Sequence, residues 1–188
     1  MTIPNILTVF RLILITPVVM LYLHEYTMAS AMLFILACVT DILDGFIARE
    51  FNMISNVGKV LDPLADKLMT LSILIAMEFK GMLSMWVIVI FLVKELLMLF
   101  GGAILYSRKI VVFSSWHGKV ATCVIWGLVL ALFFFGDVLS IQFRLFIEGF
   151  ACAITIFALL VYSTQFFKNV TPNFYSGVIH MFNKKYKK

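Results

Sequence analysis

The sequence contains little charge. Only 13% of its 188 residues are Asp, Glu, Lys or Arg, whereas soluble domains carry about 25%. Hydrophobic residues make up 63% of the chain, and its mean hydropathy is +1.05. This composition excludes an ordinary soluble domain and predicts an integral membrane protein.

Cysteine and linker-type residues are also scarce. The three cysteines, Cys38, Cys123 and Cys152, are far apart and each lies within an apolar run. Such a set excludes a disulfide framework and a zinc-binding pattern, so we interpret them as small buried apolar residues. The four prolines and ten glycines form no linker, and we therefore expect one membrane-embedded domain over residues 1–188. The first apolar run lacks the basic segment and cleavage site of a signal peptide, so we interpret it as a retained helix.

Long apolar runs dominate what remains. Six of them cover roughly residues 6–23, 29–48, 59–78, 84–106, 118–136 and 143–166. A helix that crosses a membrane needs about 20 apolar residues, whereas barrel strands are shorter and alternate in polarity. The sequence therefore predicts an all-α integral membrane fold with six transmembrane helices.

Basic residues gather in alternate connections between these runs. They lie in the 49–59 and 107–119 loops and after residue 166, whereas the opposite connections hold only Lys80 and Arg144. The positive-inside rule then places the basic loops and both termini at the cytoplasmic side. The Lys-rich end suits anionic lipid head groups, although a solvated tail explains it equally well. We expect membrane lipids and no nucleic acid as partners.

Four aspartates interrupt the apolar pattern between residues 41 and 66. Asp41 and Asp44 are three residues apart at the end of the second run, and Asp62 and Asp66 are four apart at the start of the third. Helical spacing places the members of each pair on one face. All four carboxylates are therefore expected to meet between two neighbouring helices, near the cytoplasmic interface.

Four ionised carboxylates are costly in a low-dielectric site if they have no partner. They could be protonated, pair with Arg49, Lys59 or Lys67, or bind divalent cations. Carboxylate oxygens suit Mg²⁺ or Mn²⁺, which bridge proteins to substrate phosphates, and two such ions clamp a transferring phosphoryl group. We favour metal binding over a simple ion pair or helix cap because two aspartate pairs occur on adjacent helices, each beside a glycine.

The segment 41–66 resembles the signature of the CDP-alcohol phosphatidyltransferases. It reads D-x2-D-G-x2-A-R-x8-G-x3-D-x3-D, and every fixed position is present: Asp41, Asp44, Gly45, Ala48, Arg49, Gly58, Asp62 and Asp66. Members of this family transfer a phosphatidyl group from CDP-diacylglycerol to an alcohol and release CMP. The opening IPNILTVFRL and the phrase LDPLADK resemble the phosphatidylglycerophosphate synthase and eukaryotic-type cardiolipin synthase branches.

The resemblance implies a role for each of these positions. Asp41, Asp44 and Asp62 would ligate two divalent ions, Mg²⁺ or Mn²⁺, with Asp66 at the edge of the second site. Asp66 would also be the catalytic base that takes the hydroxyl proton of the acceptor. The nucleotide would be bound by the remaining positions: Gly45, Ala48, Arg49 and Gly58. The resemblance also implies the six-helix family fold, a homodimer, for which the GGAIL stretch at 101–105 offers a packing face, and, for a short chain of bacterial appearance, the plasma membrane.

Basic residues on other helices are candidates for binding an acceptor phosphate: Lys94, Arg108, Lys109, Lys119 and Arg11. Lys94 lies next to Glu95 inside the run WVIVIFLVKELLMLF, where an ionisable residue indicates a function, a side chain that extends to the membrane surface, or a structural ion pair with another helix. Neighbouring residues do not share a helix face, so we expect Lys94 and Glu95 to have separate partners. Lys119, in HGKVAT, resembles the G-K-x2-T element of the family.

The identity of the acceptor alcohol stays open. Phosphatidylglycerophosphate synthases often carry Arg-Glu in place of Lys94–Glu95 and a further arginine where this chain reads FGGAIL. This departure leaves room for phosphatidylglycerol, the acceptor of cardiolipin synthases, or another alcohol. We favour glycerol 3-phosphate because the whole chain most resembles that branch. A cation transporter is a remote alternative, because the acidic residues cluster near one membrane interface and the second half of the chain has no matching set. An inactive scaffold is equally remote, because all four aspartates are present.

Overall fold

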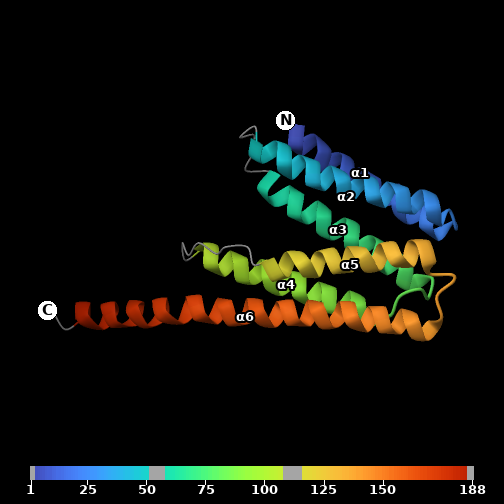
Figure 1. Cartoon of the computed structure of the whole chain (residues 1–188). Coiled ribbons are helices and arrows are strands. Elements are labelled where there is room, and N and C mark those ends of the chain that lie inside the picture. Colours follow the sequence, from blue (N-terminus) through green and yellow to red (C-terminus); the bar gives the residue numbers. More distant parts are fainter. Residues whose placement is uncertain (1–2, 51–57, 108–115, 186–188) are drawn as a thin grey trace.

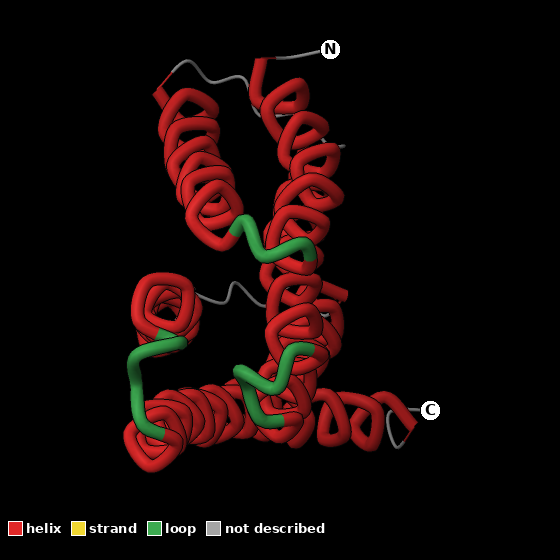
Figure 2. The backbone as a smooth tube through the Cα atoms, turned by 90° about the vertical axis from the view of Figure 1, so that its right-hand side faces the viewer, coloured by secondary structure: helices red, strands yellow, loops and turns green. Residues whose placement is uncertain are grey.

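In this computed structural model, the described backbone covers residues 3–50, 58–107 and 116–185, and the described side chains lie within residues 6–41, 43, 61–102, 104 and 118–166. The described ranges form six helices, joined by short connections (Figures 1 and 2). Their bounds are α1 (Ile3–Leu23), α2 (Thr27–Glu50), α3 (Gly58–Phe79), α4 (Met85–Ser107), α5 (Trp116–Phe135) and α6 (Ile141–Lys185). The prediction of an all-helical chain is confirmed.

Four helices contain a stretch that is long and apolar enough to cross a membrane: Ile6–Leu23 in α1, Met85–Gly102 in α4, Gly118–Phe135 in α5 and Ile141–Phe166 in α6. In α2, the side chains that are described without a gap form a shorter apolar stretch, Thr27–Asp41. α3 carries Asp62, Asp66 and Lys67 close to its start. The described residues thus support four of the six predicted spans, and in the described part of α3 the apolar pattern is interrupted by Asp62, Asp66, Lys67 and Glu78.

The six helices pack as two groups of three. α1 packs against α2 and α3, and α6 packs against α4 and α5; Figure 1 shows these groups one above the other. Contacts of α2 with α5, and of α3 with α4 and α5, join the groups. Buried apolar side chains from both groups, among them Phe34, Ile73, Phe91 and Ile125, form one continuous core.

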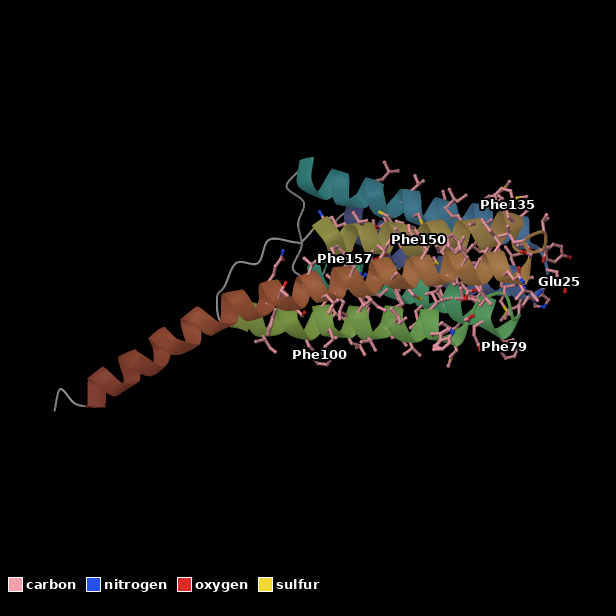
Figure 3. The ribbon with its side chains drawn as sticks, turned by 60° about the horizontal axis from the view of Figure 1, so that its bottom comes forward. Glu25, Phe79, Phe100, Phe135, Phe150 and Phe157 are labelled. Carbon is pink, nitrogen blue, oxygen red and sulfur yellow. The ribbon has the colours of Figure 1, made fainter. Side chains whose placement is uncertain are left out.

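The outer surface of this bundle is apolar as well. Phe100, Phe150 and Phe157 are 66%, 59% and 59% exposed, and Figure 3 places them along the length of α4 and α6. A surface of this kind would be unstable in water but matches the hydrocarbon interior of a bilayer. The exposed phenylalanines therefore support the prediction of an integral membrane protein.

α6 differs from the prediction in length. The sixth apolar run was expected to end at residue 166, but the helix continues to Lys185. Figure 1 shows this continuation projecting beyond the other helices. Hydropathy marks where a membrane span ends, whereas a helix continues for as long as its backbone hydrogen bonds do.

Gly101 allows α4 and α6 to approach closely. A Cβ atom at this position would collide with the ring and hydroxyl of Tyr162, whereas a Cβ at Gly102 would meet nothing within 4 Å. The first glycine of GGAIL therefore packs against a helix of the same chain. The second is exposed and leaves that side of α4 open.

Candidate functional site

α1 supplies partners for two aspartates of the signature. The Asp41 carboxylate pairs with the Arg11 guanidinium at 2.6 Å, and Asp62 accepts a hydrogen bond from the Thr8 hydroxyl. Both α1 residues are almost fully buried, with 1% of Arg11 and none of Thr8 exposed. Arg11, considered above for an acceptor phosphate, thus balances an aspartate. The contribution of Thr8 was not predicted, because nothing local in the sequence indicates that α1 lies against α3.

Several predicted site residues lie where only the backbone is described. Asp44, Gly45, Ala48 and Arg49 fall in the last turns of α2, and Gly58 begins α3. This placement agrees with the helical spacing on which the prediction rests. The side chains of these residues lie outside the described part of the chain, as do Arg108 and Lys109 entirely.

A cavity of about 320 Å³ opens beside the described aspartates. It lies between α2, α3, α4 and α5, and its charged lining residues are Asp41, Asp66, Lys67, Lys94, Glu95 and Lys119. The cavity therefore joins two signature aspartates to two lysines that were singled out for an acceptor phosphate from distant parts of the sequence. Opposite charges around one cavity suit a ligand that carries phosphate and a hydroxyl group to be deprotonated.

Lys94 and Glu95 contact each other, which corrects one expectation. Lys94 Nζ donates to Glu95 Oε1 at 2.7 Å, although residues adjacent in a helix were expected to point apart. The long lysine side chain bends around the helix to close the gap. The expectation of separate partners is nevertheless also met, because Lys94 Nζ lies 3.0 Å from Thr122 Oγ1 and Lys67 Nζ lies 3.2 Å from Glu95 Oε2.

Hydroxyl groups link the same helices around Asp66. Trp126 Nε1 of α5 donates to Thr70 Oγ1 of α3 at 3.1 Å, and Thr70 Oγ1 donates to the backbone carbonyl of Asp66 at 3.0 Å. Thr122, the last residue of the G-K-x2-T element, donates to the Gly118 carbonyl at 3.2 Å. The bond between Trp126 and Thr70 thus joins α5 to α3 beside the cavity, and of the two threonines only Thr122 was part of a pattern recognised in the sequence.

The cysteines are free, as expected, but they are not fully buried. Cys38 and Cys152 are half-buried, and Cys123 is exposed at the edge of the cavity. A thiol is only weakly polar, so it can lie on the apolar outer surface of this bundle. The expectation of buried cysteines is therefore wrong for Cys123.

The donor set of the signature fits a hard divalent cation. The carboxylates of Asp41 and Asp66 line one cavity, and carboxylate oxygen is the ligand that Mg²⁺ and Mn²⁺ prefer. Among the described residues, no group of three or more His, Cys, Asp or Glu is arranged to hold an ion. Asp41 and Asp62 instead contact Arg11 and Thr8, partners that a cation would have to replace or share.

Comparison with known proteins agrees with the signature. The CDP-alcohol phosphatidyltransferase family matches residues 1–166 of this chain. Two similar proteins are each named CDP-diacylglycerol--glycerol-3-phosphate 3-phosphatidyltransferase. The one from Aquifex aeolicus is 36% identical over 65% of this chain and 70% of its own length. The one from Mycoplasma genitalium is 29% identical over 73% of this chain and 64% of its own length.

A third relative carries a different name. It is a cardiolipin synthase (CMP-forming) / mitochondrial hydrolase fusion protein of Schizosaccharomyces pombe, 36% identical over 57% of this chain and 18% of its own length. The match thus spans less than two thirds of the length of two of these three relatives. The family match covers all six apolar runs and the complete aspartate signature. The chain therefore belongs to the CDP-alcohol phosphatidyltransferase family and is an enzyme of that class.

Proposed function

We propose that this enzyme transfers a phosphatidyl group from CDP-diacylglycerol to glycerol 3-phosphate, giving phosphatidylglycerophosphate and CMP. The observation that carries the proposal is the single cavity lined by Asp41 and Asp66 on one side and by Lys94 and Lys119 on the other. Lysine ammonium groups bind phosphate as compact positive charges. The names of the Aquifex and Mycoplasma relatives support the same acceptor.

In the proposed reaction, the acceptor hydroxyl gives its proton to Asp66 as its oxygen forms a bond to the phosphatidyl phosphorus. The bond from that phosphorus to the bridging oxygen breaks, and CMP leaves with the electron pair. Lys94, Lys119 and Arg108 would orient the acceptor phosphate, so that attack follows from positioning more than from covalent catalysis. The nucleotide would lie against the end of α2 and the start of α3, bound by the fixed positions of the signature: Gly45, Ala48, Arg49 and Gly58.

Two divalent ions, Mg²⁺ or Mn²⁺, would be held by Asp41, Asp44, Asp62 and Asp66. When bound, they neutralise negative charge on the two phosphates as CMP departs. The need for such neutralisation follows from the substrate, because CDP-diacylglycerol brings a negatively charged pyrophosphate next to four carboxylates. Arg11 of α1, which contacts Asp41, would then balance part of the negative charge of that carboxylate.

The placement in the membrane is part of the proposal. All six helices would cross the bilayer as a single domain over residues 1–188. Both termini and the cavity would face the cytoplasm of a bacterial cell, as the distribution of basic residues indicates. A homodimer would form as in the family, and the open side of α4 at Gly102 is available for it.

A second acceptor has specific support. Lysine at position 94 lacks the bidentate grip of arginine, and the FGGAIL stretch of α4 has no arginine to add a second clamp. The name of the Schizosaccharomyces pombe relative points to cardiolipin synthesis. Phosphatidylglycerol is therefore the alternative acceptor that the test must include.

The test is an acceptor comparison with purified full-length protein, CDP-diacylglycerol and Mn²⁺, in which CMP release is measured. Glycerol 3-phosphate, phosphatidylglycerol, inositol phosphate and serine are supplied in parallel, and we expect turnover with glycerol 3-phosphate. Turnover with phosphatidylglycerol alone would replace the first acceptor by the second. EDTA should stop CMP release and added Mg²⁺ or Mn²⁺ should restore it, whereas full activity in EDTA would exclude the metal role.

A further inference from the structure

Glu95 is a buried carboxylate that the proposed reaction does not use. Only 6% of the residue is exposed, and it lies in the middle of an apolar span of α4. A buried ion pair is seldom worth more to stability than apolar residues of the same size. Its presence beside the cavity therefore calls for an explanation other than stability.

The two oxygens of Glu95 bind two different lysines. Oε1 accepts from Lys94 at 2.7 Å, and Oε2 lies 3.2 Å from Lys67 Nζ. The same Lys67 Nζ lies 3.3 Å from Asp66 Oδ2. A continuous chain of charges thus runs from Asp66 through Lys67 and Glu95 to Lys94, with two positive and two negative groups in balance.

These contacts determine where Lys94 points. An ammonium group has three N–H donors, and two of those of Lys94 meet Glu95 Oε1 and, at 3.0 Å, Thr122 Oγ1. Fixing two donors fixes the direction of the third. Because Lys94 is 1% exposed and yet lines the cavity, that third donor is the one available to a ligand there.

We propose that Glu95 is a positioning residue, which aims Lys94 at the acceptor phosphate and, through the shared Lys67, sets the orientation of the Asp66 carboxylate. This inference rests on the proposed function, since it assumes that an acceptor with a negative charge occupies the cavity. It adds a link between the two sides of the site. The group that binds the acceptor and the group that removes its proton would be held by one carboxylate.

The comparison with Glu148 separates positioning from stability. Glu148 is 5% exposed, but it lies at the opposite end of the bundle, where it accepts from the backbone N–H of Ser84 at 3.3 Å, just before α4 begins. A carboxylate at a helix N-terminus has a structural role. The two buried glutamates are thus matched in burial and differ in whether they contact the cavity.

The test compares Glu95→Gln, Glu95→Asp and Glu148→Gln in the purified full-length enzyme, using whichever alcohol the unmodified enzyme turns over. A glutamine can accept from one lysine, but its NH₂ group opposes the other. We expect Glu95→Gln to raise the KM for the acceptor about tenfold or more, as loss of one charge-assisted hydrogen bond would, and the KM for CDP-diacylglycerol by less than about twofold. The acceptor KM of Glu95→Asp should lie between those of the unmodified enzyme and Glu95→Gln, because aspartate keeps the charge but its side chain is shorter.

Three outcomes would overturn the inference. They are an unchanged acceptor KM in Glu95→Gln, an equal rise of both KM values, or the same acceptor effect in Glu148→Gln. A Lys94→Met background adds a second check, because Glu95→Gln should then raise the acceptor KM little further. If Glu95→Gln does not fold, Glu95→Asp alone decides between an acceptor effect and none. Absence of turnover with glycerol 3-phosphate would contradict the proposed function and leave this test intact for another alcohol.

Discussion

The two ends of the helical bundle both carry charge, but they hold it differently. At the cavity end, Arg11 and Asp41 meet at 2.6 Å, and only 2% of the arginine side chain is exposed. At the opposite end, Lys80 and Glu25 are 3.6 Å apart, and 87% of the Glu25 side chain is exposed. Figure 3 shows Glu25 at that end of the molecule, beyond the apolar side chains of the bundle.

This difference shows which charges need an explanation. An exposed ion pair contributes about 0–1 kcal/mol and costs little to keep. A buried pair loses hydration that its own attraction often does not restore, so a protein that keeps several at one end of an apolar bundle uses them for something else. The contrast between the ion pairs points to the cavity end as the place of chemistry, in agreement with the aspartate signature.

The largest expected effect comes from Asp66→Asn, which tests whether the cavity end acts in catalysis. Asparagine preserves the shape of the side chain but cannot take a proton, so we expect CMP release to fall about a hundredfold to ten-thousandfold. The control is Asp137→Asn at the opposite end, in an exposed position, which should leave turnover within about twofold, as expected of a surface substitution. Asp66→Asn should remain folded in detergent, and Asp137→Asn should keep the thermal midpoint of the unmodified protein. Normal turnover of Asp66→Asn would remove the residue from the role of base.

Local features of the chain were predictable from the sequence. The number of helices and most of their bounds follow from apolar run length, and the pairing of Asp62 with Asp66 on one face follows from helical period. Lys94 and Lys119 also stood out among the basic residues of the sequence, because Lys94 lies inside a long apolar run and Lys119 lies in the HGKVAT element. Both lysines do line the cavity beside Asp66.

Features that depend on how helices pack were not predictable. No pattern within α1 indicates that Thr8 contacts Asp62, because this contact joins residues 54 positions apart. The contact of Lys67 with Glu95 likewise requires α3 to lie against α4. The Lys94–Glu95 contact was missed for a different reason. Helical geometry directs the Cβ atoms of neighbouring residues apart, but the lysine side chain is long enough to bend back and reach the glutamate.

An intermediate effect is expected from Arg11→Met, which tests the burial of charge directly. Removing the guanidinium leaves Asp41 without its nearest positive partner, and breaking a buried pair in this way destabilises by about 3–5 kcal/mol. Because 29% of the Asp41 side chain is exposed, we expect a loss near the lower limit. The measurement is the thermal midpoint in detergent with EDTA, which keeps divalent ions from replacing the arginine.

The double variant Arg11→Met, Asp41→Asn is the control for that measurement. It removes both charges of this pair, so it should recover part of the lost stability. If the double variant is instead less stable than Arg11→Met, the arginine stabilises the bundle through its packing and not through its charge. The cavity end would then resemble any other part of the core.

The smallest expected effect comes from Glu25→Gln at the opposite end. The pair with Lys80 is long and one partner is almost fully exposed, so its loss should change the free energy of unfolding by about 0.5 kcal/mol or less. Salt should reduce even this difference, because exposed charges are screened. The measurement repeats the detergent midpoint at low and at high ionic strength, with turnover assayed alongside. A loss of stability as large as that of Arg11→Met would mean that the ion pairs of the two ends do not differ in their contribution to stability, and the burial of an ion pair would no longer identify the functional end.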